Sequence, residues 1–381
     1  MNFAFRTVPH VIFEAGAAAR LGALVKSRMK RPVIVTDKGV VNAGLINAAL
    51  KSLNAEGLDF LLFDEIEADP PARIVRGAVE AARARKADGV IGFGGGSSMD
   101  TAKIVAALLN SSQDLEDIYG AGNIKGARAP LVLLPTTAGT GSEVTDIAVV
   151  TTDDDQKMGV LGDQMFADIA ILDPELTYGL PRYVTAATGV DAMVHAIEAY
   201  TSRHRKNPVS DALAREALRL LSSNIVEACK APSNREARAN MLLGAMLAGQ
   251  AFTNSPVGAV HGMAYPLGAL FHIPHGASNA LMLEPVLRFN ASAAAHLYAE
   301  LGDVIGAEAT GGFAERCEAF IGKLMAIVTE TGVERRLSNL GVSHNDLPRM
   351  AEDAIKAERV MRNNPREVTY EDALRMYGEV L

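Results

Sequence analysis

Short apolar runs rich in β-branched residues alternate with amphipathic stretches over the first half of the chain. The runs predict six strands, at Val33–Thr36, Leu61–Phe63, Val90–Phe93, Leu131–Leu134, Ala148–Thr151 and Ile169–Leu172. Between the earlier strands, apolar residues recur at helical spacing over Leu45–Asn54, Ile74–Lys86 and Met99–Leu109. Because strands that alternate with helices usually lie side by side and point the same way, the pattern predicts a parallel sheet wound by helices.

The second half of the chain has a different composition. After the turn-forming segments Leu172-Asp173-Pro174 and Gly179-Leu180-Pro181, the sequence is rich in alanine and leucine. The longest such stretches are Asp211–Ala228, Arg235–Phe252 and Ala314–Thr331. Their composition predicts helices. We therefore expect an α/β dinucleotide-binding domain over residues 1–180 and an all-helical, metal-binding domain over residues 181–381.

Composition and charge narrow the function classes. A chain of 381 residues is long enough to bury two cores. Its formal net charge of -8 argues against nucleic acid or an anionic membrane as partner, because both reward clustered Lys and Arg, and leaves a small molecule as the expected partner. Cys229 and Cys317 have no metal-type spacing, which argues against a disulfide framework. Neither a signal-peptide pattern nor a long apolar run is present, so we expect a cytoplasmic protein.

A glycine-rich turn follows the third predicted strand. The segment Gly94-Gly95-Gly96-Ser97-Ser98 joins this strand to the helical pattern that begins at Met99. Glycines let the backbone approach a diphosphate closely, and the free N–H groups at a helix start favour its negative charge. Met99 stands where the third glycine of the G-x-G-x-x-G fingerprint would be, so a plain capped turn is the alternative interpretation.

Two other predicted strand ends carry polar groups. The segment Pro135–Thr145 is dense in threonine and glycine, which can donate hydrogen bonds to a phosphate or a ribose, although it can also be a plain polar loop. Asp37 closes the strand Val33–Thr36. Its carboxylate can accept hydrogen bonds from an adenosine ribose, which would favour NAD over NADP, or it can cap the helix that follows.

The strongest candidate chemistry lies in the second half. Asp191 and His195 are four residues apart, so a helix would place both on one face. Their surroundings are apolar, and burying an unpaired carboxylate and imidazole is costly, which argues against an ordinary surface pair. Three of the eight histidines fall within fifteen positions, namely His261, His272 and His275. Because Pro266 and Pro274 disfavour one straight helix here, His261 should lie in one helix and His275 at the turn that opens the next. One carboxylate and three imidazoles suit Fe(II), Zn(II) or a neighbouring first-row ion.

Taken in order, these motifs resemble those of the iron-containing, or group III, alcohol dehydrogenases. The resemblance runs from Thr36-Asp37-Lys38 through the glycine turn and the threonine loop to Gly189–His195, His261–Gly276 and Asn364-Pro365-Arg366-Glu367. It implies a Rossmann-like α/β domain followed by an all-α domain, an architecture similar to that of dehydroquinate synthase, with the active site in the cleft between them. It also implies a homodimer or larger homo-oligomer.

The resemblance also assigns residues. The implied metal ligands are Asp191, His195, His261 and His275. The implied cofactor-binding residues are Asp37, Gly95, Gly96, Ser97, Thr137 and Thr140, with Lys157 as a further candidate. Two positions depart from the family pattern: Tyr265 replaces a histidine that many members have four residues after the third ligand, and Ala68-Asp69-Pro70 replaces an asparagine between two prolines near the adenine. We expect Tyr265 and His272 to be catalytic residues, and the alternative for Tyr265 is a packing role only.

The expected reaction is the interconversion of a small alcohol and its aldehyde or ketone, with NAD rather than NADP as hydride carrier. A divalent cation, Fe(II) in the first place and Zn(II) as the alternative, would act as a Lewis acid toward the substrate oxygen. A lyase of the dehydroquinate-synthase kind is one alternative, but it would need several Lys and Arg near the metal. A metal-dependent hydrolase and a hydroxyacid-oxoacid transhydrogenase are the others.

Overall fold

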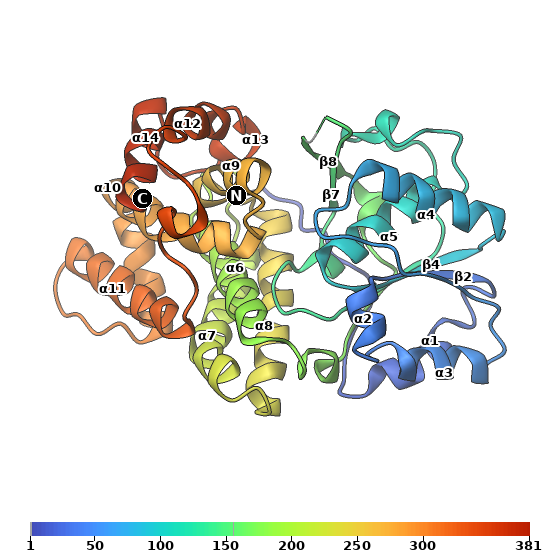
Figure 1. The fold of residues 1–381 in the computed structure, drawn as a ribbon. Helices are drawn as coiled ribbons and strands as arrows, with labels where there is room; N and C mark the ends of the chain where they lie inside the picture. Colours follow the sequence, from blue (N-terminus) through green and yellow to red (C-terminus); the bar gives the residue numbers. More distant parts are fainter. Residues whose placement is uncertain (1, 155) are drawn as a thin grey trace. The chain divides into compact units, whose positions relative to one another are not determined.

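The computed structural model describes residues 2–154 and 156–381, and these form two compact units. The sheet unit comprises Thr7–Thr137 and Gly141–Tyr178. The helical unit comprises Gly179–Leu381, the three-residue segment Ala138–Thr140 and the N-terminal residues through Arg6. In Figure 1 the sheet unit runs from blue to green, and Gly179–Leu381 of the helical unit run from green to red. The predicted fold class, a parallel α/β region followed by a helical region, is confirmed.

Six parallel strands form the main sheet, in the order β1-β9-β6-β4-β2-β3. Along this order the strands span Val11–Phe13, Ile169–Leu172, Leu131–Pro135, Gly89–Gly94, Pro32–Val35 and Leu61–Phe63. The four inner strands are buried along their whole length, as expected for a parallel sheet that helices cover on both faces. The order reverses between β2 and β4, and ligands of such sheets bind at the carboxyl ends of the strands at this point.

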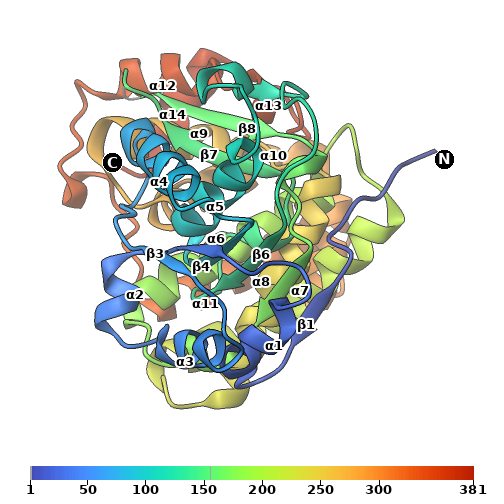
Figure 2. The same ribbon diagram turned by 90° about the vertical axis from the view of Figure 1, so that its right-hand side faces the viewer.

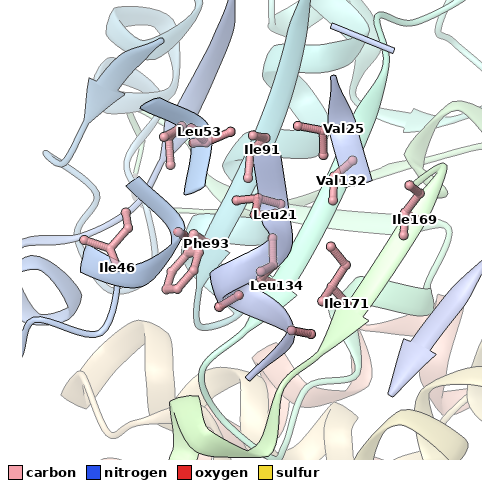
Figure 3. Packing of buried hydrophobic residues seen from close by; sticks show 14 of the residues in the cluster. Leu21, Val25, Ile46, Leu53, Ile91, Phe93, Val132, Leu134, Ile169 and Ile171 are labelled. Atoms are coloured by element: carbon pink, nitrogen blue, oxygen red, sulfur yellow. The ribbon is translucent and has the colours of Figure 1, made fainter. Parts of the chain in front are cut away.

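Helices cover the two faces of this sheet. They are α1 Leu21–Val25, α2 Lys38–Asn42, α3 Asn47–Ala55, α4 Ala72–Ala84 and α5 Gly96–Leu108. In Figure 2, α4 and α5 lie on one side of β3 and β4, and α1 and α3 lie on the other. Ile91 and Phe93 of β4 belong to the core that includes α1 and α3 (Figure 3). Gly92 faces α5, where an added Cβ would lie 2.7 Å from Cβ of Ala102, so α5 can pack closely on the strand.

One predicted strand lies outside the parallel sheet. β7 (Ile147–Thr151) pairs antiparallel with β8 (Lys157–Leu161), which pairs with β5 (Gly120–Ala121) in a separate three-stranded sheet. Its residues alternate between buried and half-buried, the pattern of a strand with one covered face, so it is wrong to count it among the parallel strands. The sequence did not predict β1, β5 or β8, because runs of two to five residues carry little periodic signal.

The helical unit is built around α6, which is buried from Gly189 to Thr201. Its helices are α6 Arg182–Thr201, α7 Pro208–Lys230, α8 Arg235–Asn254, α9 Ala259–Phe271, α10 His275–Ile305, α11 Phe313–Thr331, α12 Leu347–Ile355, α13 Glu358–Met361 and α14 Tyr370–Glu379. Short 3-10 turns occur at Ala17–Arg20, Glu116–Ile118, Ser142–Val144, Asp163–Met165, Pro174–Thr177 and Ser338–Leu340. No helix among residues 2–154 and 156–381 combines the length and the apolar character needed to cross a membrane.

Candidate active site

The four predicted metal ligands lie together in the helical unit. Asp191 and His195 are one turn apart on α6, His261 lies on α9, and His275 is the first residue of α10. One potential ligand atom from each residue lies within 4.8 Å of the other three. The Nε2 atoms of the three histidines are each 3.8 Å from Oδ1 of Asp191.

Glycines next to the ligands let these helices approach one another. An added Cβ on Gly276, beside His275, would lie 2.3 Å from the carbonyl oxygen of Ala187 on α6. An added Cβ on Gly262, beside His261, would lie 2.4 Å from Sδ of Met361 on α13. The expected break between two helices is also present: Pro266 lies inside α9, and Pro274 precedes α10. Close packing at the glycines therefore fixes where the imidazoles lie.

Burial sets the charge of the cluster. Asp191, His195 and His261 are 2%, 4% and 3% exposed, and His275 is half-buried. Burial lowers the pKa of His195 to about 3, so this ring is neutral and keeps a lone pair at neutral pH. Although burial opposes ionisation of Asp191, attraction to the three imidazoles and a hydrogen bond from Asn279 hold the pKa of its carboxyl below the ordinary value. The cluster therefore contains the carboxylate of Asp191 and a ring lone pair of His195.

Glu198 fixes the tautomer of His261. This carboxylate lies two turns after Asp191 on α6 and is 6% exposed. Its Oε2 is 2.6 Å from Nδ1 of His261, and its Oε1 accepts a hydrogen bond from the backbone N of Val260 at 2.7 Å. A proton on Nδ1 leaves the lone pair of Nε2 directed toward Asp191. Carboxylate partners of this kind commonly orient metal-ligating histidines.

Asn279 lies beside three of the four ligands. Its Nδ2 donates to Oδ1 of Asp191 at 2.6 Å and is 3.2 Å and 3.3 Å from Nε2 of His261 and His275. One amide group has two hydrogens for these three acceptors. Its own Oδ1 is buried and has no hydrogen-bond partner among the residues that the structure describes.

These observations fit a divalent cation. A tetrahedral site with bonds of about 2.0–2.2 Å separates its ligand atoms by roughly 3.3–3.6 Å, close to the 3.8 Å spacing around Asp191. The ligand atoms converge on the position that Nδ2 of Asn279 approaches. Three lone-pair atoms face one another there, and the amide supplies only two hydrogens for them. Asp191, His195, His261 and His275 would hold such an ion, while Glu198 and Asn279 support them.

The two predicted catalytic residues have different surroundings. Tyr265 lies one turn after His261 on α9, and the positive charge of Arg359 acts on its phenol. Burial raises the pKa of the Tyr265 phenol above its ordinary value, so it remains protonated at neutral pH. His272 ends α9 in a left-handed backbone conformation with φ 54°, and its side chain is exposed. It is not among the clustered ligand groups of the described residues. Phe252 stacks on His195, with ring centroids 4.4 Å apart.

In the sheet unit, Asp37 and the glycine turn border one hollow of about 330 Å³. Its lining comes from Asp37–Gly39, Ile66–Ala68 and Gly95–Ser98. Oδ1 of Asp37 accepts a hydrogen bond from the backbone N of Val40 at 3.0 Å, so Asp37 does cap α2. Its Oδ2 accepts from Oγ of Ser98 at 3.4 Å and remains beside the turn. The first-turn N–H groups of α5 have no partner within their own helix, an arrangement that favours an anion.

The other predicted cofactor-binding residues do not all border this hollow. Thr137 is adjacent to the turn, since an added Cβ on Gly95 would lie 3.8 Å from its Cγ2. Lys157 pairs with Asp69 at 2.6 Å, and the backbone N of Asp69 donates to Oγ of Ser97 at 3.2 Å. Thr140 belongs to the segment Ala138–Thr140 of the helical unit. The structure therefore brings six of the predicted residues to one side of the sheet unit, namely Asp37, Gly95, Gly96, Ser97, Thr137 and Lys157. Thr140 belongs to the other unit.

Sequence reasoning missed three residues around the metal ligands: Glu198, Asn279 and Arg359. Glu198 follows Asp191 by two helical turns, and Asn279 follows His275 by one, so helical spacing placed both on the ligand faces. Arg359 gave no such signal, because α13 is separated in sequence from α9 and only the fold brings them together.

Comparisons with known proteins agree over both units. The family described as iron-containing alcohol dehydrogenase matches residues 9–174, and the C-terminal part of the Fe-containing alcohol dehydrogenase family matches residues 185–381. Long-chain-alcohol dehydrogenase 1 of Geobacillus thermodenitrificans is 36% identical over 364 residues, which cover 94% of this chain and 90% of that protein.

Solved structures give the same result. The crystal structure of a 1,3-propanediol oxidoreductase has a TM-score of 0.97 and 32% identity, and the match covers 100% of both chains. A sulfoacetaldehyde reductase from Bifidobacterium kashiwanohense, solved in complex with NAD+, has a TM-score of 0.89 and 28% identity over 100% of this chain and 99% of that one. Family matches over most of the sequence and relatives above 30% identity along nearly its whole length show that this chain belongs to the iron-containing alcohol dehydrogenase family.

Proposed function

We propose that this enzyme interconverts a small alcohol and its aldehyde or ketone, with a divalent metal, Fe(II) in the first place, held by Asp191, His195, His261 and His275. One observation carries the proposal: three imidazole nitrogens lie at equal distance from a buried carboxylate in a chain of this family. The bound metal would polarise the substrate oxygen, and NAD would carry the hydride.

The surrounding side chains prepare this chemistry. Glu198 holds the Nδ1 proton of His261, so the Nε2 lone pair is available without a tautomer change. Phe252 covers one face of His195 and helps keep water from the cluster. Tyr265 keeps its proton at neutral pH and can donate a hydrogen bond to a substrate oxygen. His272 is a weaker candidate, because its side chain is exposed at the end of α9.

NAD is the proposed cofactor, with NADP less favourable. The Asp37 carboxylate borders the same hollow as Gly95, Gly96 and Ser97, and its negative charge would repel a 2′-phosphate there. Thr137, Thr140 and Lys157 are proposed to contribute further contacts. The solved NAD+ complex of the Bifidobacterium sulfoacetaldehyde reductase supports the choice of nicotinamide cofactor. Three expectations stay predictions from the sequence: a domain boundary at about residue 180, location in the cytoplasm and assembly as a homo-oligomer.

The alternative reactions are less well supported. The relatives named above are a dehydrogenase, an oxidoreductase and a reductase, which favours hydride transfer over a lyase or hydrolase reaction. A hydroxyacid-oxoacid transhydrogenase would differ by turning over without added NAD. Net formation of NADH from 1,3-propanediol or a longer primary alcohol would distinguish the dehydrogenase from the transhydrogenase.

The central test is His275→Ala, with the exposed His344→Ala as a matched control. The His275 variant should lose its metal, measured by elemental analysis, and at least about a hundredfold of its NAD-linked turnover, because the Lewis acid loses one of four ligands. The control should keep both, and circular dichroism should show the same helix content in both variants. A His275→Ala protein that retains one metal per chain and normal turnover would refute this ligand assignment.

A further inference from the structure

Tyr265 and Arg359 form a pair of hydrogen-bonding side chains beside the metal ligands. Tyr265 follows His261 by one helical turn, so both project from the same face of α9. α13, which carries Arg359, lies directly against this helix. An added Cβ on Gly262 would lie 2.4 Å from Sδ of Met361 and 3.4 Å from Cγ2 of Val360. This contact holds α13 next to the ligand His261, and the positive charge of Arg359, one residue before Val360, acts on the Tyr265 phenol.

The pair offers donors and almost no acceptor capacity. A guanidinium has five N–H donors and no acceptor, so toward the Tyr265 phenol it can only donate. The phenol hydrogen cannot be donated to a guanidinium, so it can be donated to an oxygen of a ligand. In this segment Asp353 pairs with Arg349 and Lys356, and no carboxylate partner of Arg359 occurs among residues 2–154 and 156–381. Arg359 is exposed and its charge is not neutralised locally.

A set of donors with a net positive charge recognises an anion. Planar guanidinium groups bind carboxylate and sulfonate oxygens through parallel hydrogen bonds. The rest of the neighbourhood is acidic: the carboxylates of Glu198 and Asp191 both act on the Tyr265 phenol, and the whole chain carries a net charge of -8. A cation at this position therefore offsets a field that would otherwise repel an anionic substrate.

We propose that Arg359, together with the Tyr265 hydroxyl, binds an anionic group of the substrate, which makes short aldehydes and alcohols with a terminal carboxylate or sulfonate the preferred substrate class. The inference rests on the proposed function, since it places the reacting carbon at the metal ligands. One helical turn separates His261 from Tyr265 by about 6 Å along the axis, a span that an aldehyde of roughly two to four carbons covers. The phosphates of the cofactor carry the same chemistry, so the experiment must separate the two sources of anion.

The test compares matched aldehydes with the metal-loaded enzyme and NADH. Sulfoacetaldehyde is paired with propanal, and succinic semialdehyde with pentanal. In Arg359→Gln the ratio of kcat/KM for the anionic aldehyde to that for its neutral partner should fall about tenfold or more, because a charge-assisted hydrogen bond is lost. Arg359→Lys keeps the charge and should lose less. Arg362→Gln removes one charge from the same short segment and should leave the ratio at the parent value.

Two outcomes of this comparison would overturn the inference. An unchanged ratio with a raised KM for NADH would assign Arg359 to the cofactor phosphates. Equal losses for both aldehydes together with lost metal would make Arg359 a structural residue. Calorimetric titration with isethionate supplies a readout that needs no turnover: Arg359→Gln should bind it about tenfold more weakly than the parent. If the parent binds isethionate but reduces no aldehyde, the proposed function fails while the anion site stands.

Discussion

Replacing Glu198 by glutamine removes a negative charge from the support of one metal ligand without changing the size of the side chain. In the parent, Oε2 of Glu198 accepts from Nδ1 of His261 and Oε1 accepts from the backbone N of Val260. Glutamine has one oxygen for these two donors, so one hydrogen bond to a charged group is lost, and such a bond contributes about 1.5–3 kcal/mol. At about 1.4 kcal/mol for each factor of ten, we expect metal affinity to fall roughly ten- to a hundredfold.

The measurement is a competition between the metal-free protein and a chromophoric chelator for Zn(II) or Fe(II). Glu198→Asp, which retains the charge, should recover part of the affinity. Glu300→Gln is the matched control, because Glu300 accepts a hydrogen bond from the Tyr200 phenol in the same unit and lies outside the ligand cluster. A folded Glu198→Gln protein that binds metal within twofold of the parent would show that this carboxylate does not position His261.

Three further predictions follow from other contacts. Asp37→Asn keeps the oxygen that caps Val40 but loses the charge, so the NADP/NAD ratio of kcat/KM should rise about tenfold; an unchanged ratio would leave Asp37 as a cap only. Burial raises the pKa of Glu143 from 4.5 to about 7, so the folded chain holds this proton more tightly than the unfolded chain and stability falls as pH rises from 4.5 to 7. Glu143→Gln should therefore raise the melting temperature above pH 7 and change it little below pH 4.5, and a lower melting temperature at pH 8 would contradict this. Gly276→Ala introduces a Cβ 2.3 Å from the Ala187 carbonyl oxygen and should lower the free energy of unfolding, measured in denaturant, by about 1–3 kcal/mol; parent-like stability would show that the helices can separate without cost.

Much of the fold could be predicted because long periodic segments determine it. The strands at Leu61–Phe63 and Ile169–Leu172 have the expected bounds, and the glycine turn joins β4 to α5 as expected. The separate sheet of β5, β7 and β8 could not be predicted, because strand partners depend on contacts that are distant in sequence. The assignment of β7 to the parallel sheet was wrong for this reason.

The candidate site shows the same division between local and distant information. Asp191 and His195 share a helix, so their spacing alone indicates a common face. Their approach to His261 and His275 depends on close helix packing, which the sequence indicates only through the family resemblance. The contact between Tyr265 and Arg359 joins residues 94 positions apart, from 265 to 359, and no local pattern predicts it.

The segment Ala138–Thr140 has a consequence for how the chain can be divided. An added Cβ on Gly139 would lie 2.6 Å from Cβ of Thr188, so this segment packs on α6 although the residues on both sides of it belong to the sheet unit. The chain therefore crosses between the units at four places, after residues 6, 137, 140 and 178. A single cut at residue 178 leaves Gly139 in one fragment and Thr188 in the other. Separately expressed halves should consequently fold poorly alone and be recovered best by co-expression, as complementing fragments.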